Sequence, residues 1–427
     1  MKHRDAEIER LVTGPLVPKD EIQHLAASAV HLKGIVRAGA VWPELECGTS
    51  FLHAGPPLGD REPRAAMKGA VMALLLAQGV AGNVNEAHAL VDDGALSLRP
   101  CHEVSAVGAM AGVVGAATPV VVVEAANGMR GYAPMNEGLG SALRFGDFDP
   151  TTIDRLRYLT TVVAPALSRA IQAADPIDVV ELQADALRRA DEGHNRNVAA
   201  TSMLATILAP HLIEANDSVQ GEAAARELRD NGHFFLAPSM AAAKVLADGL
   251  HARGPRGIVT AIASNGHSTG IRVSGTRGWF ERPARIEVFQ PLHGMDRRDA
   301  DHPVGDSSVV ETIGLGAMAL SAAPGLARAM GWSLEQAQAH VGQMYAICET
   351  TSPRYTIPTR NFEPAPLGIS VAKVLETGIL PAFTTGFSHT ELGHGRVGFG
   401  MVRVDRGAFE DAAAALAGKT VAGVDHA

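Results

Sequence analysis

The spacing of hydrophobic residues divides the chain into parts of different character. Near the start, short apolar runs such as SFLH (50–53) and VVVV (120–123) are typical of strands, whereas Arg64–Gln78 repeats its apolar residues with the period of a helix. Asp149 and Pro150 suit an N-cap and a first helical position. From there to about Arg256 only helical periodicity is present.

Alternating β-branched residues return at Gly257. The runs on either side of Asn265-Gly266 predict a β-hairpin, because Asn-Gly favours the tight turns that join antiparallel strands. We therefore expect a multidomain α/β (α+β) fold in which two α/β domains flank a helical domain, with boundaries at 1–149, 150–256 and 257–427.

Two stretches have less regular patterns. We interpret the segment from Ala6 to Ala38 as short helices. The uncharged run from Val104 to Val123 is long enough for a membrane span, but it contains three glycines and a proline and changes period midway. This run therefore predicts a small-residue helix, a turn and a strand.

Composition narrows the class of protein. Of the 427 residues, 46% are hydrophobic and 19% charged, which is typical of a globular chain. The net charge of -9, without a basic block, argues against nucleic acid or an anionic membrane as the main partner but permits a small anionic substrate. Three cysteines without CxxC spacing and a charged start without an apolar signal region suggest the cytoplasm.

The stretch from Gly368 to Val404 is the richest in chemically active residues. Its glycines let the backbone approach a ligand closely, and it also holds histidines, glutamates, hydroxyls and arginine. His389 and Glu391 are two residues apart, so on an extended segment they point to the same side. We interpret this stretch as the centre of a site.

Several single residues admit both a functional and a structural interpretation. His53 follows a strand and precedes a Gly-Pro-Pro turn, where it contacts a ligand or merely bonds to backbone. Lys68, near a helix start, faces an anion or solvent. His102 lies at a helix entry, which favours anions, and we interpret Cys101 beside it as structural. Arg272 points away from its apolar neighbours on a strand.

Three further groups of residues have the same ambiguity. Glu137 and Arg144 are seven residues apart and share a helix face, where a surface ion pair is the simpler interpretation. Arg196, with His194, interrupts an apolar stripe and either projects into a site between domains or marks a polar helix end. Asp306 precedes a small-residue helix, as an N-cap or as an acid facing a ligand.

Together these motifs resemble one family, the AllG-type subunit of oxamate carbamoyltransferase from anaerobic allantoin degradation. The ordered set spans nearly the whole chain: LHAGPP (52–57), MKGA (67–70), PCHxVxAVGxM (100–110), NEGxG and RFG (136–146), HxRN (194–197), NG and GIRVSG (265–275), GDSxxxETxGxG (305–316) and ETGIxPxxxTGxxHxExGxG (376–395). His394 lies outside this pattern, and the spacing in HTELGH differs from that of the zinc motif HExxH.

The resemblance implies carbamoyl transfer between oxalurate plus phosphate and oxamate plus carbamoyl phosphate, a step of purine catabolism. It also implies a cytoplasmic complex with two partner subunits, one of them similar to succinyl-CoA synthetase. We further expect a homo-oligomer. The acyl partner stays open, because related chains serve other ureides.

This chemistry needs an arginine for a carboxylate, backbone N–H groups for an oxyanion, and an acid for the leaving nitrogen. We expect His389, oriented by Glu391, to be the acid–base group, with His53 and His102 as alternatives. The residues expected to bind substrate are Arg144, Arg272, Asn136, Glu137, Asp306, Glu311, Asn265, Lys68 and Arg196.

No GxxxxGK[ST] loop occurs, so we predict no nucleotide or other cofactor. No ligand spacing singles out a metal, although assistance by a divalent metal stays open. Two other classes also stay open. One is a non-catalytic subunit that binds substrate or holds partner chains through the helices of 151–256. The other is a stand-alone amidohydrolase of small ureides, in which water replaces phosphate.

Overall fold

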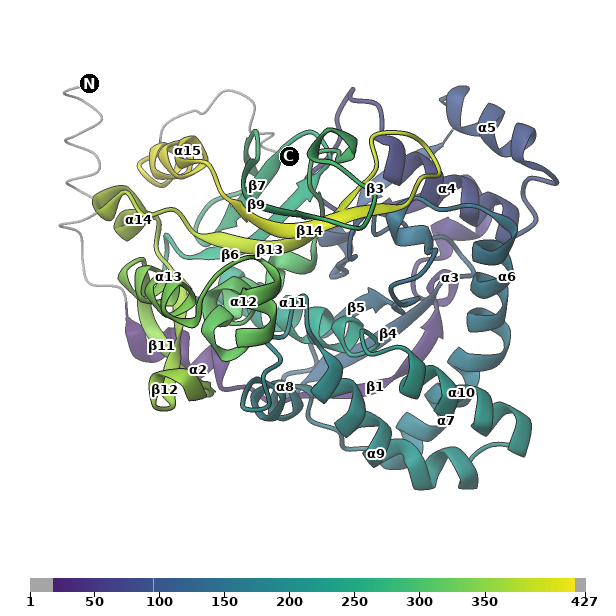
Figure 1. Cartoon of the computed structure of the whole chain (residues 1–427), viewed down its shortest axis with the longest axis horizontal. Helices are drawn as coiled ribbons and strands as arrows, with labels where there is room; N and C mark the ends of the chain where they lie inside the picture. The colour runs from purple at the N-terminus through teal and green to yellow at the C-terminus, as the bar shows by residue number, and fades with distance from the viewer. Residues whose placement is uncertain (1–17, 95, 419–427) are drawn as a thin grey trace.

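The structure, a computed structural model that describes residues 18–94 and 96–418, mixes helices with small sheets (Figure 1). Four sheets are antiparallel, with strand orders β1-β4-β5, β10-β6-β7-β8, β13-β14-β9 and β11-β12, and β2-β3 is parallel. The strands are β1 Val30–Arg37, β2 Ser50–His53, β3 Ser97–Pro100, β4 Pro119–Ala125, β5 Arg130–Pro134, β6 Val259–Asn265, β7 Thr269–Val273, β8 Phe280–Arg282, β9 Arg285–Pro291, β10 Val304–Gly305, β11 Cys348–Ile357, β12 Glu363–Ile369, β13 Ala382–Ser388 and β14 Arg396–Arg403.

The helices concentrate in the middle of the chain. The α-helices are α2 Lys19–Ala26, α3 Ala38–Val41, α4 Ala65–Ala77, α5 Val84–Asp92, α6 Pro150–Tyr158, α7 Ala164–Ala174, α8 Val179–Leu187, α9 Val198–Glu214, α10 Ser218–Asp230, α11 Leu236–Arg253, α12 Pro324–Ala329, α13 Leu334–Ala346, α14 Val371–Thr377 and α15 Arg406–Leu416. Short helical turns are η1 Pro43–Cys47, η2 Cys101–Val104, η3 Leu143–Phe145, η5 Arg297–Asp299, η6 Ser307–Ile313, η7 Gly316–Ala322 and η8 Pro358–Arg360, and η4 Leu159–Val163 is a π-helix. The expected mixed class is confirmed, while the three domain boundaries stay a prediction.

Helix α11 runs through the centre of the molecule and is buried almost all round, as expected for a helix with apolar and small residues on every face. It contacts β4 and β5 on one side and β6 and η6 on another. A Cβ added to Gly131 of β5 would lie 2.4 Å from the carbonyl oxygen of Ala241, so glycine permits this close packing. The main hydrophobic core accordingly includes residues from Val30 to Met401.

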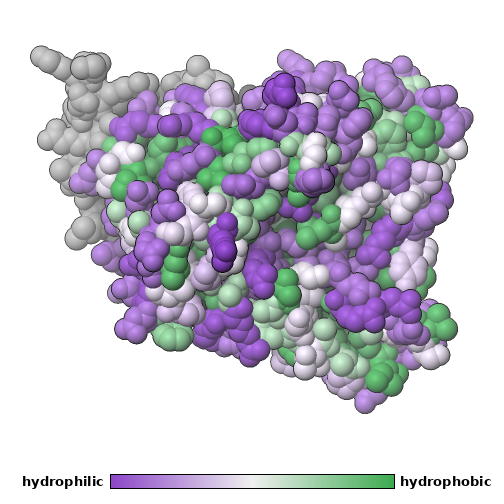
Figure 2. Space-filling model, in the orientation of Figure 1, coloured by the Kyte–Doolittle hydropathy of each residue, from purple (hydrophilic) through white to green (hydrophobic). Residues whose placement is uncertain are grey.

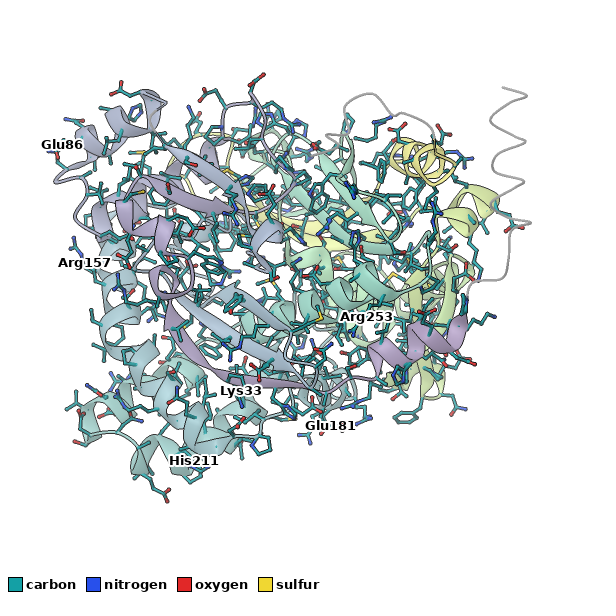
Figure 3. The ribbon with its side chains drawn as sticks, turned by 180° about the vertical axis from the view of Figure 1, so that it is seen from behind. Lys33, Glu86, Arg157, Glu181, His211 and Arg253 are labelled. Carbon is teal, nitrogen blue, oxygen red and sulfur yellow. The ribbon has the colours of Figure 1, made fainter. Side chains whose placement is uncertain are left out.

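Helices α9 and α10 form an antiparallel pair at one edge of the molecule, at the lower right in Figure 1. Figure 2 shows hydrophobic residues on the surface at this edge. Ile213 is 81% exposed and Val219 73% exposed. Seen from behind in Figure 3, the labelled His211 lies on the same projecting pair.

Three expectations for local structure are wrong. Val30–Arg37 forms a strand, because buried and half-buried side chains alternate along it; residues 6–17 of the expected helical segment lie outside the described residues. The segment 105–118 forms an irregular loop, in which Gly108 and Gly112 approach so closely that a Cβ on Gly108 would lie 2.4 Å from the other Cα. The run 307–322 forms two short 3₁₀ turns.

Across residues 18–94 and 96–418, the helices all lack the combination of length and apolar character that crossing a bilayer requires.

Asp306 joins the first and third parts of the chain. Its fully buried carboxylate accepts hydrogen bonds from the backbone N–H of Gly55 (2.6 Å) and Gly108 (3.0 Å), and its own N–H donates to the Gly108 carbonyl (2.8 Å). Gly55 has φ +96°, and a Cβ there would lie 2.5 Å from the Ser264 carbonyl oxygen, so only glycine suits this approach.

We predict that Asp306→Ala destabilises the fold, because it leaves two buried N–H donors unpaired at a cost of about 1–3 kcal/mol each. Urea unfolding followed by circular dichroism would measure the loss. The exposed Asp60→Ala is the matched control and should leave the unfolding midpoint unchanged. Equal midpoints for the two variants would contradict this role for Asp306.

Asp306→Asn tests the charge separately. Burial raises the pKa of Asp306 to about 7, although the Gly55 and Gly108 N–H groups lower it. Between about pH 4, the pKa of an unfolded aspartate, and pH 7, the folded protein therefore keeps a proton that the unfolded chain loses. The free energy of unfolding should fall as pH rises through this window, and it should fall less in Asp306→Asn.

Candidate active site

A pocket of about 170 Å³ is lined by residues from all three parts of the chain, 1–149, 150–256 and 257–427. Its walls come from the loop before β4, the η3 turn, the loops before α9 and α11, and segments of η6, α12, β13 and β14. The lining residues are Ala109, Met110, Leu139, Arg144, Phe145, His194, Asn195, His233, Leu236, Ser307, Leu326, Gly386, Arg396 and Phe399. Polar groups far apart in the sequence thus face one small space, which is typical of a ligand site.

Arg144 forms one side of this pocket. It lies in the η3 turn and is 6% exposed, and its Nη2 donates to the Gly138 carbonyl at 2.6 Å. Its guanidinium lies 4.5 Å from the centroid of the Phe145 ring, and its Nε is 3.7 Å from Oε2 of Glu137. Burial lowers the pKa of Arg144 to about 10 although Glu137 raises it, so the guanidinium stays charged at neutral pH.

Arg396, the first residue of β14, approaches the same space from the other side. Its guanidinium lies 5.7 Å from the Phe145 ring centroid and 5.8 Å from that of Phe399, and its Nε donates to the Gly398 carbonyl at 3.4 Å. Burial lowers its pKa, and no carboxylate in the described part of the chain forms an ion pair with it. Two guanidinium groups with one flanking acid leave an excess of positive charge, which favours a small anion.

His194 forms the floor of the pocket together with a buried acid. Its Nδ1 is 2.8 Å from Oε1 of Glu311, which also accepts from the backbone N–H of Thr384 (3.1 Å) and Ala317 (3.2 Å). Burial lowers the pKa of His194, but Glu311 and then Glu192 raise it, and the net result is a raised pKa. With Nδ1 engaged, Nε2 is the nitrogen left to serve a ligand, and the imidazole favours its protonated form.

The loop that carries His194 is held by Glu192. This acid is fully buried and accepts from the backbone N–H of Asn195 (2.6 Å) and Arg196 (2.9 Å). Burial raises the pKa of Glu192 to about 7, while His194 lowers it and Glu311 raises it. Two acids of the same buried cluster therefore surround one imidazole, which explains why its proton is retained.

His233 and Asn195 complete the polar lining. Burial, together with the charges of Arg144 and Arg396, lowers the pKa of His233 to about 3, so its imidazole is neutral. Its Nδ1 and the Asn195 Nδ2 are buried and have no hydrogen-bond partner among the described residues. Buried polar atoms of this kind are rare and suggest that a ligand supplies the partner.

His53 and His102 lie outside the lining of the pocket, His102 beside Asp306. His53 bonds through Nδ1 to the Ala54 carbonyl (2.8 Å), and burial lowers its pKa to about 4. His102 Nε2 is 3.5 Å from the Asp306 carboxylate and its ring packs edge-on against Trp279, and burial lowers its pKa well below the usual value. Both imidazoles are therefore neutral at physiological pH and are poor proton donors.

The other sequence-predicted residues are scattered. Glu311 reaches the pocket through His194, whereas Asn136 and Glu137 lie behind Arg144 in a neighbouring cavity.

Four of the sequence-predicted residues lie away from the pocket. Lys68 and Arg196 pair with acids. Arg272 lies beside His251, and Asn265 bonds to the backbone of the 56–57 turn.

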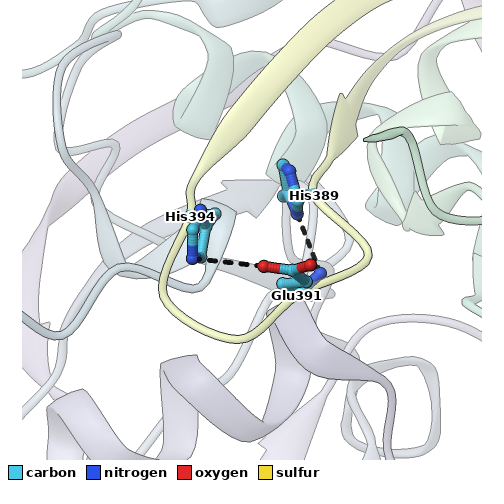
Figure 4. A group of neighbouring side chains, drawn as sticks. All are labelled: His389, Glu391 and His394. Atoms are coloured by element: carbon cyan, nitrogen blue, oxygen red, sulfur yellow. Dashed lines mark hydrogen bonds and ion pairs between the residues drawn. The ribbon is translucent and has the colours of Figure 1, made fainter. Parts of the chain in front are cut away.

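His389 and Glu391 lie at the tip of the β13–β14 hairpin, outside the lining of the pocket (Figure 4). His389 Nδ1 accepts from the Glu391 N–H at 2.9 Å, and His394 Nε2 is 3.5 Å from Oε2 of Glu391. The ligand atoms of these three residues lie within 4.8 Å of one another, a set that could hold a metal ion. Because His389 Nδ1 accepts an N–H, its Nε2 carries the proton in the neutral ring, which opposes metal binding there.

Sequence reasoning missed Arg396, His233 and Asn195 as site residues. Arg396 had a detectable signal, since it is an arginine with small and apolar residues on both sides in the glycine-rich stretch. His233 lies in a loop between two helices, and its sequence neighbourhood gave no such signal.

Comparison with known proteins gives consistent results. The family described as "Oxamate carbamoyltransferase subunit AllG" matches residues 96–307. Oxamate carbamoyltransferase subunit AllG of Escherichia coli (strain K12) is 35% identical over 401 residues, 93% of this chain and 96% of that protein. The "Uncharacterized protein YahG" of the same organism is 34% identical over 95% of this chain and 88% of its own length. A crystal structure of a conserved protein of unknown function from Enterococcus faecalis V583 superposes with a TM-score of 0.87 at 33% identity, covering 94% of this chain and 97% of that one.

We predict that the His194 pKa lies above 6.5 and falls below it in Glu311→Gln, because burial then dominates. NMR titration of the histidine ring carbons would measure both values, with His194→Gln to assign the signal. Glu391→Gln, which removes the acid beside two surface histidines, should leave the His194 titration unchanged. If the His194 pKa is the same in Glu311→Gln as in the unmodified chain, Glu311 does not control the protonation of His194.

Proposed function

We propose a function from one premise: this chain belongs to the AllG family of oxamate carbamoyltransferase subunits. A subunit of such an enzyme works with partner subunits. Our proposal is that this chain carries the site at which a carbamoyl group passes between oxalurate, or a related ureide, and phosphate. The products are oxamate and carbamoyl phosphate.

The observation that carries the proposal is the convergence of two arginines and a proton-retaining histidine on one small pocket. Oxalurate and phosphate are both anions. The guanidinium of Arg396 suits the oxalurate carboxylate bidentately, and Arg144 suits phosphate. Each ligand offsets charge that the pocket leaves unbalanced.

The proposed step requires one proton transfer to the leaving group. A phosphate oxygen attacks the carbamoyl carbon, and the bond from that carbon to the oxamate nitrogen breaks. His194 Nε2 donates a proton to this nitrogen, and the proton that hydrogen phosphate brings restores the imidazolium. Glu311 holds the ring orientation and stabilises its charged form throughout.

His389 stays the alternative acid–base group predicted from sequence. His389 lies at the exposed hairpin tip beside Glu391. It would reach a ligand in the pocket only if the hairpin closed over the pocket or a partner subunit covered the hairpin tip. His194 needs no such movement, which is why we favour it.

The decisive experiment assays oxamate and carbamoyl phosphate from oxalurate and phosphate, with the chain alone and with its two partner subunits. We expect His194→Ala and Arg396→Gln to lower turnover by about a hundredfold or more, and His389→Ala to retain it. Loss of turnover in His389→Ala with normal turnover in His194→Ala would reverse the assignment. Turnover without phosphate would favour the amidohydrolase.

An assembly role is the second candidate function, favoured by the exposed apolar residues of α9 and α10. Ile213 and Val219 project from a helix pair whose other face packs on the core, and a partner subunit would bury them. This role is compatible with catalysis in the pocket, because the two surfaces do not share residues.

We predict that Ile213→Asp weakens association with the partner subunits by at least tenfold, since a charge would enter an apolar interface. Co-purification and analytical ultracentrifugation would measure it. Val84→Asp, which changes an exposed apolar residue on α5, is the control. If both variants assemble like the unmodified chain, this surface is not the interface.

A further inference from the structure

A second and larger cavity, of about 280 Å³, lies behind Arg144. Its walls are the last turns of α4, the loop 109–119, the end of β5, the η3 turn, and the α6–η4 helix. Arg157 lies at its edge and is labelled at the rim of the molecule in Figure 3. Ala109 and Arg144 line both this cavity and the anion pocket, so one guanidinium separates the two spaces.

Three polar atoms without a hydrogen bond belong to residues that line this cavity. Asn136 Nδ2, Glu137 Oε2 and Arg144 Nε are buried and have no hydrogen-bond partner in the described part of the chain. The side chains of Glu137 and Arg144 are 9% and 7% exposed, and Asn136 is 4% exposed. Glu137 and Arg144 form an ion pair at 3.7 Å, which is too long for a hydrogen bond. Leaving three buried atoms without a hydrogen bond is costly, which suggests that a ligand supplies the missing bonds.

Other polar groups of the cavity wall are satisfied. Gln78 donates to the Leu74 carbonyl (3.2 Å) and accepts from the Ala117 N–H (2.9 Å). The remaining surface is largely aliphatic, from leucine, alanine, valine and proline side chains. The ligand space is therefore lined mostly by apolar side chains, with polar groups from Asn136, Glu137 and Arg144.

The helix beside the cavity is wound in an unusual way. Leu159–Val163 form a π-helical segment that ends two residues before Pro165, which has no N–H to donate to the Thr161 carbonyl. The wider turn relieves the clash that the proline ring would cause. Leu159, Thr160 and Thr161 of this segment line the cavity, and π-segments of this kind are frequent at functional sites.

We propose that this cavity binds a small amphipathic ligand with an apolar body and a neutral carboxamide or ureido head. The carbonyl oxygen of the head accepts from Asn136 Nδ2 and Arg144 Nε, and its N–H donates to Glu137 Oε2. A carboxylate head would oppose Glu137, and an ammonium head would oppose Arg144. Two donors, Asn136 Nδ2 and Arg144 Nε, and one acceptor, Glu137 Oε2, thus select a neutral amide over either charged analogue. The inference does not rest on the proposed catalytic function.

Hexylurea is a suitable probe, compared with hexanoate and hexylammonium of the same chain length. Isothermal titration calorimetry on the full chain should detect hexylurea binding and at least tenfold weaker binding of both charged probes. Asn136→Leu should weaken hexylurea binding by about tenfold. Ala77→Phe, which places a large side chain in the wall of the cavity, should abolish it while phosphate binding in the other pocket persists.

Thr160→Phe fills the cavity from the π-segment and replaces Ala77→Phe if that variant does not fold. Absence of hexylurea binding, equal binding of hexanoate, or unchanged binding in both filled variants would overturn the proposal. Failure of the carbamoyl transfer assay with intact hexylurea binding would count against the proposed function alone, and the reverse result would count against this inference alone.

Discussion

The buried carboxylate of Asp306 is the constraint on which the site depends. It pairs with backbone N–H groups of Gly55 and Gly108, and the residues next to these bonds form the pocket wall: Ala109 and Met110 follow Gly108, and Ser307 follows Asp306. The spacing between the first and third parts of the chain is therefore set by hydrogen bonds rather than by apolar contact alone. Directional bonds of this kind fix geometry more narrowly than burial, which is non-directional.

Charge in the pocket is separated rather than cancelled. The guanidinium groups of Arg144 and Arg396 line the pocket and share the Phe145 ring, whereas the carboxylates of Glu311 and Glu192 lie beneath it around His194. An anion entering the pocket meets positive charge first, and the acids behind the imidazole keep its proton available. Neither effect needs a metal or a cofactor, because fixed protein charges in a buried space act more strongly than they do in water.

The sequence was sufficient where a single local rule decides the structure. The Asp149–Pro150 helix start and the hairpin around Asn265-Gly266 are both present, because each depends on neighbouring residues only. The two-residue spacing predicted that His389 and Glu391 share one side of an extended segment, but Glu391 lies in a bend of the hairpin loop.

The remaining features of the fold and the pocket depend on contacts between segments that are far apart in the sequence. His233 enters the pocket from a loop between two helices, and no pattern in its own segment indicates this. The GAMA run after residue 107 has helical composition, yet the close contact of Gly108 with Gly112 and the bond from Gly108 to Asp306 hold it as a loop. Small residues are good helix formers and also permit close backbone contacts, so their sequence leaves both outcomes open until the partner segment is known.

Arg144 lines both cavities, so a ligand that bonds to it in one cavity is expected to affect binding in the other. Its Nη2 is already bound to the Gly138 carbonyl, so Nε and Nη1 are the donors left to serve ligands on either side. A group that bonds to Nε from the larger cavity also fixes the guanidinium plane that the anion pocket presents. The first ligand to bind bears the entropic cost of ordering the Arg144 side chain, so the second ligand binds with a smaller cost. This coupling is reciprocal by thermodynamic necessity. If the proposed amide ligand binds in the larger cavity, its bond to Arg144 should raise the affinity of the smaller pocket for an anion.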